Sequence, residues 1–387
     1  MRMQILTTGR PEEWTQVVQQ CPHHDFYHLP QYHALAEESG EGKAFLFHYV
    51  EGAYSIALPL LLRSIDGLPS SRPASAPWQD ATSVYGYAGP IASQLDIPEP
   101  VIQNFQSSLR KHLHDMAVVS VFSRLHPLFP QQALLSGMGE CQTLSRTVSI
   151  DLTLPAETQR AAFRKSHKEG INKLGRQGVT CVHDCDGVYL DDFIEIYHET
   201  MRRVGAAPGY FFPPSYFRKV SDTLGDRLHL IVCLHEGKVV CGAIFVECCG
   251  ILQYHLGGTA NAALRLAPMK LLHDTTRIWA NGRDLKFFHL GGGATTQPDD
   301  SLLYFKLGFS PRTHDFAVWR WVLLADVYSR LCAETSRWNE QNGLTVANAG
   351  FFPEYRTPTV QPALPPPYLV NPKEMWQAPE PPQEANL

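Results

Sequence analysis

Apolar residues recur with two periods along the first half of the chain, and these periods predict an alternation of short helices and strands. Residues 43–50 and 53–63 are apolar and β-favouring and flank a Glu51-Gly52 turn, which predicts a β-hairpin. Ile102, Phe105 and Leu109 follow helical spacing. The predicted helices cover residues 12–20, 31–38 and 99–116, and a buried strand covers residues 118–122.

From residue 156 onward the same patterns give a different order of elements. A basic helix is followed by a strand, two helices, three consecutive strands, a helix, a strand, a short helix, a strand and a closing helix. Their bounds are 156–177, 179–183, 190–204, 214–224, 228–234, 239–248, 251–256, 267–280, 285–290, 302–307, 316–324 and 327–341. This order fits an α/β domain with a mixed sheet and a crossover helix at 267–280.

Length and composition divide the chain further. At about 150 residues per domain, 387 residues correspond to two domains, which we place at 1–155 and 156–352. Residues 353–387 hold ten of the 29 prolines, which predicts an extended proline-rich tail. The formal charge of −5 gives no reason to expect tight binding of bulk nucleic acid, so any contact with RNA must be local.

Several classes of site and location are disfavoured. The nine cysteines show no disulfide framework, and Cys181, His183 and Cys185 lack a second ligand pair, so we expect no metal. The longest apolar stretch, residues 53–62, is half the ~20 residues of a membrane span and contains Pro59. With no secretory signal pattern at residues 1–14, we expect a cytoplasmic protein.

Four stretches, ordered along residues 80–310, resemble segments of the Fem-type acyltransferases. They are residues 80–90 (DATSVYGYAGP), 120–127 (SVFSRLHP), 163–179 (FRKSHKEGINKLGRQGV), and 288–294 (FHLGGGA) followed by 304–309 (YFKLGF). The resemblance implies two tandem GNAT-like domains, and the element order of the second half is also that of the GNAT fold. Main members of the family transfer an amino acid from aminoacyl-tRNA to an amine of a peptidoglycan precursor, and some relatives use acyl-CoA.

The resemblance therefore implies an N-acyltransferase acting on an amine of a sugar, peptide or small molecule. Two alternatives stay open: an acyl-CoA-dependent N-acetyltransferase of an amino sugar or metabolite, and a non-catalytic GNAT-like binding protein. The acceptor would be a small amine or an envelope precursor. The sequence names neither the acceptor nor the oligomeric state.

Acyl transfer needs donors for the oxyanion and a path for the proton of the amine, and this chemistry selects the candidate catalytic residues. Lys306 lies among Tyr304, Phe305 and Phe309, so apolar walls would hold its ammonium. In the matching family element, the lysine lies at the reaction centre. Asp80 could orient the amine or accept its proton. Tyr254 and His255 point to opposite faces of a strand, and of the two we favour Tyr254 as inward-facing.

Other residues are candidates for substrate binding. Gly291 and Gly292 permit close backbone approach at the end of a strand. Arg124 could clamp a carboxylate or phosphate, and His126 is as well suited to cap a turn. By the resemblance, polar groups near residues 80–126 border the acceptor groove. The full set is Tyr85, Tyr87, Arg124, His126, His255, Gly291, Gly292 and Phe305.

The donor is predicted from two observations. The junction at residues 261–269 (NAALRLAPM) contains no glycine, whereas acyl-CoA-using GNAT enzymes hold the pyrophosphate there on backbone amides, and Pro268 has none to offer. The basic helix from Arg160 to Arg176 supplies local positive charge, which favours an aminoacyl-tRNA acceptor arm over acyl-CoA and predicts no bound cofactor. The candidate donor-binding residues are Arg164, Lys165, His167, Lys168, Arg202 and Arg203.

Overall fold

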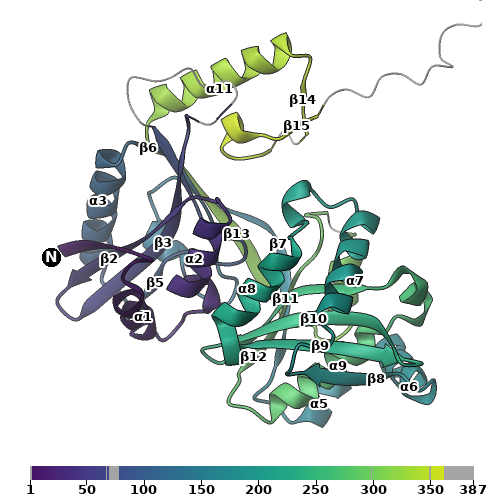
Figure 1. The fold of residues 1–387 in the computed structure, drawn as a ribbon. Coiled ribbons are helices and arrows are strands. Elements are labelled where there is room, and N and C mark those ends of the chain that lie inside the picture. The colour runs from purple at the N-terminus through teal and green to yellow at the C-terminus, as the bar shows by residue number, and fades with distance from the viewer. Residues whose placement is uncertain (1, 67, 69–77, 298, 348–349, 361–387) are drawn as a thin grey trace, which may run out of the picture.

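One twisted 13-stranded sheet runs through the whole molecule (Figure 1). The computed structural model describes residues 2–66, 68, 78–297, 299–347 and 350–360. The strands follow the order β1-β2-β3-β4-β6-β13-β7-β12-β11-β10-β9-β8, and β5 pairs with β3. The prediction of an α/β fold with a mixed sheet is confirmed.

The first half contributes one end of this sheet. Its elements are β1 (Arg2–Thr7), α1 (Pro11–Gln19), η1 (Phe26–His28), α2 (Pro30–Glu38), β2 (Lys43–Glu51), β3 (Tyr54–Ser64), β4 (Gln79–Thr82), β5 (Ile91–Ala92), α3 (Glu99–Asp115), β6 (Val118–Arg124), α4 (Gln132–Leu135) and β7 (Glu140–Asp151). The predicted hairpin is β2 and β3, paired in register from Lys43–Leu62 to Glu51–Tyr54. Its apolar side chains pack against α3 through Phe105 and Leu109, the residues with helical spacing.

The second half contributes the other end. Its elements are α5 (Ala156–Ala161), α6 (Lys165–Arg176), β8 (Thr180–Asp184), α7 (Leu190–Arg203), η2 (Pro208–Tyr210), α8 (Pro214–Leu224), η3 (Gly225–Arg227), β9 (Leu228–His235), β10 (Lys238–Cys248), β11 (Ile251–Thr259), η4 (Asn261–Leu266), α9 (Met269–Asn281), β12 (Phe287–Gly292), α10 (Ser301–Lys306), β13 (Thr313–Val322) and α11 (Ala325–Gln341). The prediction of a single helix over 156–177 is wrong, because the helix is interrupted at residues 162–164 and two helices, α5 and α6, form instead.

Two neighbouring strands diverge in the second half. Parallel strands β11 and β12 pair only at Ile251–Phe287, Leu252–Phe288 and Gln253–His289. Beyond Gln253 and His289 the two strands no longer pair, so an opening begins between them. Tyr254 and the glycines at 291–292 lie where this opening starts.

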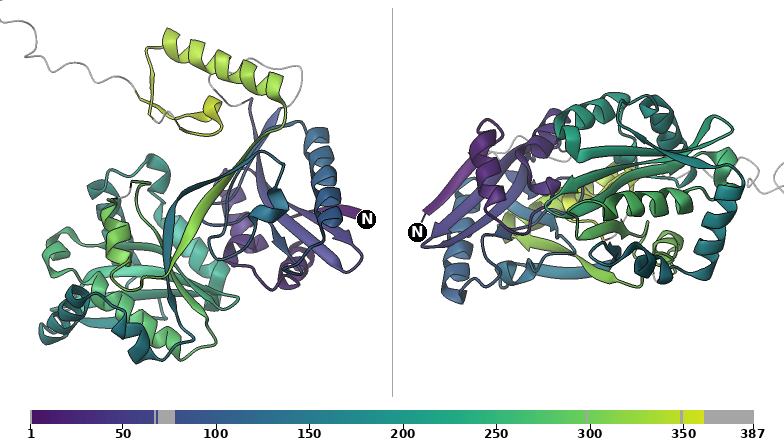
Figure 2. Two further views of the ribbon diagram at one scale, coloured as in Figure 1. Left: turned by 180° about the vertical axis from the view of Figure 1, so that it is seen from behind. Right: turned by 90° about the horizontal axis from the view of Figure 1, so that it is seen from below.

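Strands β7 and β13 join the two halves, and Figure 2 shows both running from one half into the other. β13 pairs with β6 on one side and β7 on the other, while β7 also pairs with β12. One hydrophobic core holds residues from both halves, including Tyr27 and Leu35 with Phe217 and Leu256. The division at residue 155 stays a prediction, but the sheet and this core cross it, because β13 completes the N-terminal part of the sheet.

The C-terminal segment corrects the predicted start of the tail. Residues 353–360 form η5 (Glu354–Arg356) and β15 (Thr359–Val360), which pairs with β14 (Thr345–Val346). Tyr355 is 2% exposed and hydrogen-bonds Ser120 through its hydroxyl, at 2.8 Å. These residues therefore belong to the fold despite their prolines; residues 361–387 of the predicted tail lie outside the described part of the chain. Among the described helices, none is long and apolar enough to cross a membrane.

Candidate active site

Lys306 ends the short helix α10, and the loop before this helix fixes its position. Asp300 caps α10 by accepting a hydrogen bond from the Leu303 amide at 2.8 Å. Its other oxygen accepts from the amides of Ala294 and Thr295, so one carboxylate ties the glycine-rich loop to the helix. A Cβ on Gly293 would overlap this carboxylate, which explains the glycine.

The Lys306 side chain is buried between backbone and aromatic groups. Only 4% of the residue is exposed. Its Nζ donates a hydrogen bond to the Gly292 carbonyl at 2.6 Å and lies 5.3 Å from the centre of the Tyr254 ring. Burial lowers the pKa of Lys306 to about 7, against a weaker opposing attraction from Asp300. Near neutral pH the amine is therefore divided between its charged and neutral forms.

Gly291 and Tyr87 complete the surroundings of the ammonium. Gly291 has a φ of 73°, and a Cβ there would lie 3.4 Å from Lys306 Nζ and 3.5 Å from the Tyr87 hydroxyl oxygen. Burial raises the pKa of Tyr87 to about 12, and a hydrogen bond with the Gly292 backbone partly offsets this rise. Gly292 thus engages both side chains. Lys306, Tyr87, Gly291, Gly292 and the adjacent His289 are called the Lys306 site below.

His167 packs against the C-terminal end of α10, next to Lys306. The residue is 3% exposed, and its Nε2 hydrogen-bonds the carbonyl of Phe305 at 3.0 Å. A Cβ on Gly308 would overlap the imidazole, so the ring fits closely against the end of α10. Burial lowers the pKa of His167 to about 4. The role of His167 in donor binding stays a prediction; in the structure its buried, neutral ring is hydrogen-bonded to the helix that ends at Lys306.

Tyr254 and His255 lie on opposite faces of β11, as the alternation predicted. Tyr254 faces Lys306 and packs on His273, and Phe305 packs edge-on against His273. His255 faces the first half among Tyr27, Tyr32 and Tyr85, and both its ring nitrogens lack a hydrogen-bond partner. The structure therefore brings Tyr254 to Lys306 and places His255 in the aromatic cluster between the halves.

Asp80 is placed differently from its predicted role. It is fully buried, with one oxygen accepting from Arg63 at 2.7 Å and the other from Arg356. Both oxygens are engaged, and Asp80 links β3 to the C-terminal segment. The catalytic role of Asp80 stays a prediction; in the structure its partners are Arg63 and Arg356, and none of them belongs to the Lys306 site.

His126 lies beside Tyr87 and forms part of a buried pair. Its Nδ1 accepts a hydrogen bond from the Leu128 amide at 3.2 Å, so it caps a turn as the sequence allowed. Its Nε2 donates to Asp25 at 3.1 Å, and the rings of His126 and Tyr87 are 6.1 Å apart. Both nitrogens are occupied. His126 therefore shapes the wall behind Tyr87 and holds Asp25 of the η1 cap.

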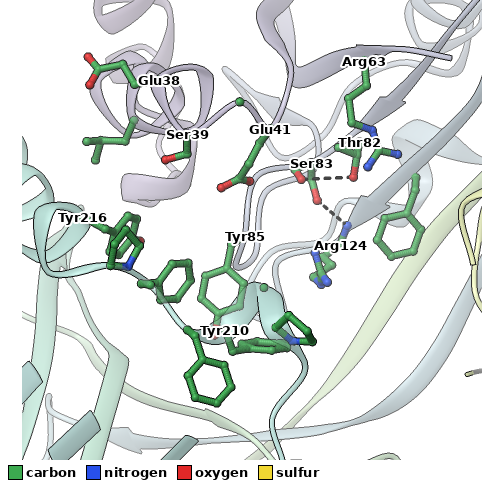
Figure 3. Close-up of a pocket in the computed structure, with 18 of the residues that line it drawn as sticks. Glu38, Ser39, Glu41, Arg63, Thr82, Ser83, Tyr85, Arg124, Tyr210 and Tyr216 are labelled. Atoms are coloured by element: carbon green, nitrogen blue, oxygen red, sulfur yellow. Dashed lines mark hydrogen bonds between the residues drawn. The ribbon is translucent and has the colours of Figure 1, made fainter. Parts of the chain in front are cut away.

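A groove of about 980 Å³ opens between the two halves (Figure 3). Tyr85, from the loop after β4, stacks edge-on against Tyr210 and lies between the α2 side and the η2 side. Arg124 borders the same space, 5.5 Å from the Phe122 ring, and has no ion pair within the described residues. The structure thus brings Tyr85 and Arg124 together in this interdomain groove and Tyr87 to the Lys306 site.

The candidate donor residues are scattered. Arg164 lies 3.8 Å over the exposed Tyr304 ring, next to α10. Lys168 donates to the Ala161 carbonyl, and Arg203 to Asn261, so both are engaged by the protein itself. Lys165 and Arg202 are exposed. Arg160 of the predicted basic face pairs with Asp274.

The junction before α9 offers few free amides. Pro268 has no amide hydrogen, and Ala267 adopts a left-handed conformation with φ 53°. The amides of Lys270 and Leu271 already donate to Ala267 and Pro268. This helix end is therefore poorly equipped to cradle a pyrophosphate.

Sequence reasoning did not identify Asp25, His289 or Asp300. Asp300 had a local signal, since an Asp three residues before Leu303 fits an N-cap. Asp25 also had a local signal, since its side chain accepts from the Phe26 amide and its own amide donates to His28 Nδ1, as in a capping box. The Gln253 partner of His289 lies on another strand, which no local spacing predicts.

The chain resembles known proteins in the sequence of its second half and in its fold. Residues 161–307 match the family model described as an acetyltransferase (GNAT) domain, a match that ends one residue after Lys306. The crystal structure of FemX matches with a TM-score of 0.65 and 13% identity, covering 85% of this chain and 99% of that one. L-PGS from Bacillus licheniformis matches at 0.50 and 14% identity, covering 80% and 91%. A protein of unknown function from Bacteroides thetaiotaomicron matches at 0.51 and 9% identity, covering 83% and 99%.

No curated protein sequence matches the chain. The structural matches establish the fold, and the family match places a GNAT domain over the second half up to Lys306. The prediction of a GNAT-type fold like that of FemX is confirmed, and the acetyltransferase (GNAT) domain matched over residues 161–307 supports the prediction of an acyltransferase enzyme.

Proposed function

We propose that this GNAT-fold enzyme transfers an aminoacyl group from aminoacyl-tRNA to an amine, forming an amide. The observation that carries the proposal is the buried Lys306, held at Gly292 beside Tyr87 where the two halves meet. A lysine kept in an apolar, backbone-lined site is suited to charge that develops during a reaction.

The chemistry follows from the groups at the Lys306 site. The neutral amine attacks the ester carbonyl of the donor, and negative charge develops on the carbonyl oxygen. Charged Lys306 donates a hydrogen bond to this oxygen, and the Tyr87 hydroxyl is a second donor. The C–N bond forms as the ester C–O bond breaks, and the proton of the amine passes to the leaving oxygen.

The choice of donor rests on the junction before α9. Its amides at Lys270 and Leu271 are engaged within the turn, and Pro268 offers none. An aminoacyl-tRNA does not need a pyrophosphate cradle there. The sequence resembles the Fem-type proteins, and the chain shares its fold with FemX. Both likenesses support aminoacyl-tRNA as the donor.

For the acceptor we propose an amine-bearing peptidoglycan precursor or a related sugar or peptide. The interdomain groove has room for such a molecule, with Tyr85 and Tyr210 as apolar contacts. Arg124 supplies positive charge at its edge, which suits a carboxylate or phosphate of the acceptor.

The experiment compares two labelled donors. Bulk tRNA charged with labelled amino acids, and labelled acetyl-CoA, are each incubated with a lysine-containing precursor peptide, glucosamine and spermidine. We expect label in an amide product from the charged tRNA, abolished by prior RNase treatment. Lys111→Met, at a lysine with a 72% exposed side chain, is the matched control for Lys306→Met.

An acyl-CoA-dependent acetyltransferase is the second candidate, because the matching family model is an acetyltransferase domain. Transfer from acetyl-CoA alone would establish this candidate and overturn the tRNA donor. Absence of transfer from either donor would favour a non-catalytic binding protein.

A further inference from the structure

His289 belongs to the Lys306 site, and neither oxyanion stabilisation by Lys306 nor donation by Tyr87 requires it. His289 lies on β12, two residues before Gly291, and is fully buried. Its ring centre is 5.4 Å from that of Tyr87, in an edge-on arrangement. The rings of His126 and His314 lie 6.2 and 6.5 Å away.

The tautomer of His289 follows from its neighbour Gln253. The amide nitrogen of Gln253 donates to the Tyr254 carbonyl at 2.9 Å, which leaves the Gln253 Oε1 facing His289. His289 Nδ1 lies 2.6 Å from this oxygen and must therefore carry the hydrogen. Its Nε2 then bears a lone pair, and this buried atom has no hydrogen-bond partner.

The two neighbouring histidines differ in this respect. His126 uses Nδ1 to accept from Leu128 and Nε2 to donate to Asp25. His314 engages Ser149 through Nε2 at 2.7 Å. Several other buried histidines also have a nitrogen without a partner, but that of His289 lies in the Lys306 site, beside Tyr87. Nε2 of His289 is therefore free to accept a hydrogen bond or a proton from a group bound at this site.

The charged and titratable groups around His289 keep it neutral. Burial lowers its pKa well below the ordinary value, and His126, His314 and Lys306 act in the same direction. The first two come from the turn after β6 and from β13, and Lys306 comes from α10. The lone pair on Nε2 is therefore available at every pH at which the protein is expected to work.

We propose that His289 is a catalytic residue that accepts the proton of the attacking amine through Nε2. The inference rests on the proposed function. As the C–N bond forms, one amine proton moves to Nε2. When the ester C–O bond breaks, His289 returns this proton to the leaving oxygen, so the imidazole is neutral at the start and the end. Lys306 stabilises the oxyanion in the same step, and the two residues thus divide the chemistry.

The test uses the full-length protein. Its acceptor is whichever of the three amines (precursor peptide, glucosamine or spermidine) the wild-type enzyme modifies. His289→Gln should lower kcat roughly 10²-fold, as for loss of a general base, with KM changed far less. His289→Ala should be as slow, and added imidazole should restore part of its rate. Rescue is measured as the rate of His289→Ala with imidazole divided by its rate without imidazole, at each pH. This ratio should rise with pH as more of the imidazole becomes neutral. The titration of Lys306 affects both rates equally and cancels in the ratio.

His33→Ala is the matched control, because His33 is equally buried, hydrogen-bonds the Tyr27 carbonyl and packs on Trp14 rather than on a residue of the Lys306 site. Imidazole should not change its rate. A rescue of His289→Ala that is independent of pH, or equal in His33→Ala, would mean that imidazole only refills a cavity and would overturn the proposal. So would a His289→Gln enzyme with wild-type kcat. If wild type transfers nothing from either donor, the proposed function fails and the role of His289 with it.

Discussion

The Lys306 site and the cluster around Asp80 are both buried, both polar, and both join segments distant in the sequence. At Asp80, each carboxylate oxygen has its own arginine, Arg63 or Arg356, so the cluster is satisfied. At the Lys306 site, a buried amine has one carbonyl partner and His289 Nε2 has none. The difference teaches that the fully paired carboxylate of Asp80 holds distant segments together, whereas the unpaired Nε2 of His289 is informative because it lies beside Tyr87 and Lys306. Other buried histidines, such as His33 and His255, also have unpaired nitrogens but lie outside the Lys306 site.

The largest expected effect is on turnover when Lys306 is removed. Lys306→Met keeps the volume of the side chain and removes the ammonium, so kcat should fall about 10²–10³-fold, as for loss of an oxyanion donor. Its thermal stability should not fall, because the folded protein no longer buries an amine. Steady-state kinetics and a melting curve measure both. Turnover within about threefold of wild type would contradict the role of Lys306.

The next effect is on stability at the contrasting cluster. Asp80→Asn leaves Arg63 and Arg356 without a counter-charge, which should cost roughly 3 kcal/mol in the free energy of unfolding. The kcat of the folded enzyme should stay near that of wild type, because Asp80 contacts no part of the Lys306 site. Urea denaturation measures the first quantity. A stable Asp80→Asn enzyme with strongly reduced kcat would reverse the comparison and restore Asp80 as a catalytic candidate.

The two regions also differ in how far the sequence could predict them. Local periodicity found the β2–β3 hairpin and helices such as α3 and α8, and the Phe-Lys motif singled out Lys306. It missed β7, whose first half is exposed or half-buried and largely polar, and it assigned residues 353–360 to a tail because of their prolines. Tyr355 and Arg356 are ordered by Ser120 and Asp80, more than 200 residues away, and local composition carries no record of such partners.

The same reasoning explains the residues of the site. Gly291, Gly292 and Lys306 belong to one motif and were found together. Asp80 and His167 are polar groups within motifs of the same kind, yet tertiary contacts engage their side chains within the fold. His289 sits inside the motif but was overlooked, because only the orientation of Gln253 reveals its free nitrogen.

A smaller effect concerns pH. Lys306 has a pKa of about 7, so its charged fraction should fall about tenfold between pH 6 and 8. When kcat/KM is corrected for the fraction of the acceptor amine that is neutral, it should fall about tenfold over the same pH range. Lys306→Arg, which stays charged, should be slower but lose this decline. A corrected profile that rises through pH 7 would instead make neutral Lys306 the base.

The free energy of unfolding, in contrast to kcat/KM, should rise with pH over the alkaline range. The folded pKa of Lys306 lies below its unfolded value, so the unfolded chain binds more protons between them. The penalty for burying the amine is full below pH 7 and is relieved as the pH rises toward 10. Lys306→Met should remove this part of the pH dependence, which is measured by denaturation at each pH.

The smallest expected effect is at Gly291, where geometry and strain act together. Its φ of 73° disfavours any side chain by about 1 kcal/mol, and a Cβ would sit 3.4 Å from Lys306 Nζ and 3.5 Å from the Tyr87 oxygen. Gly291→Ala should lower the melting temperature by a few degrees and reduce kcat, because the methyl group narrows the space where the oxyanion would lie. Gly343→Ala, at φ 62° with open space around it, carries the strain without the crowding. Equal losses of kcat in the two variants would show that strain alone is at work, and the Lys306 site would then be less tightly built than its contacts indicate.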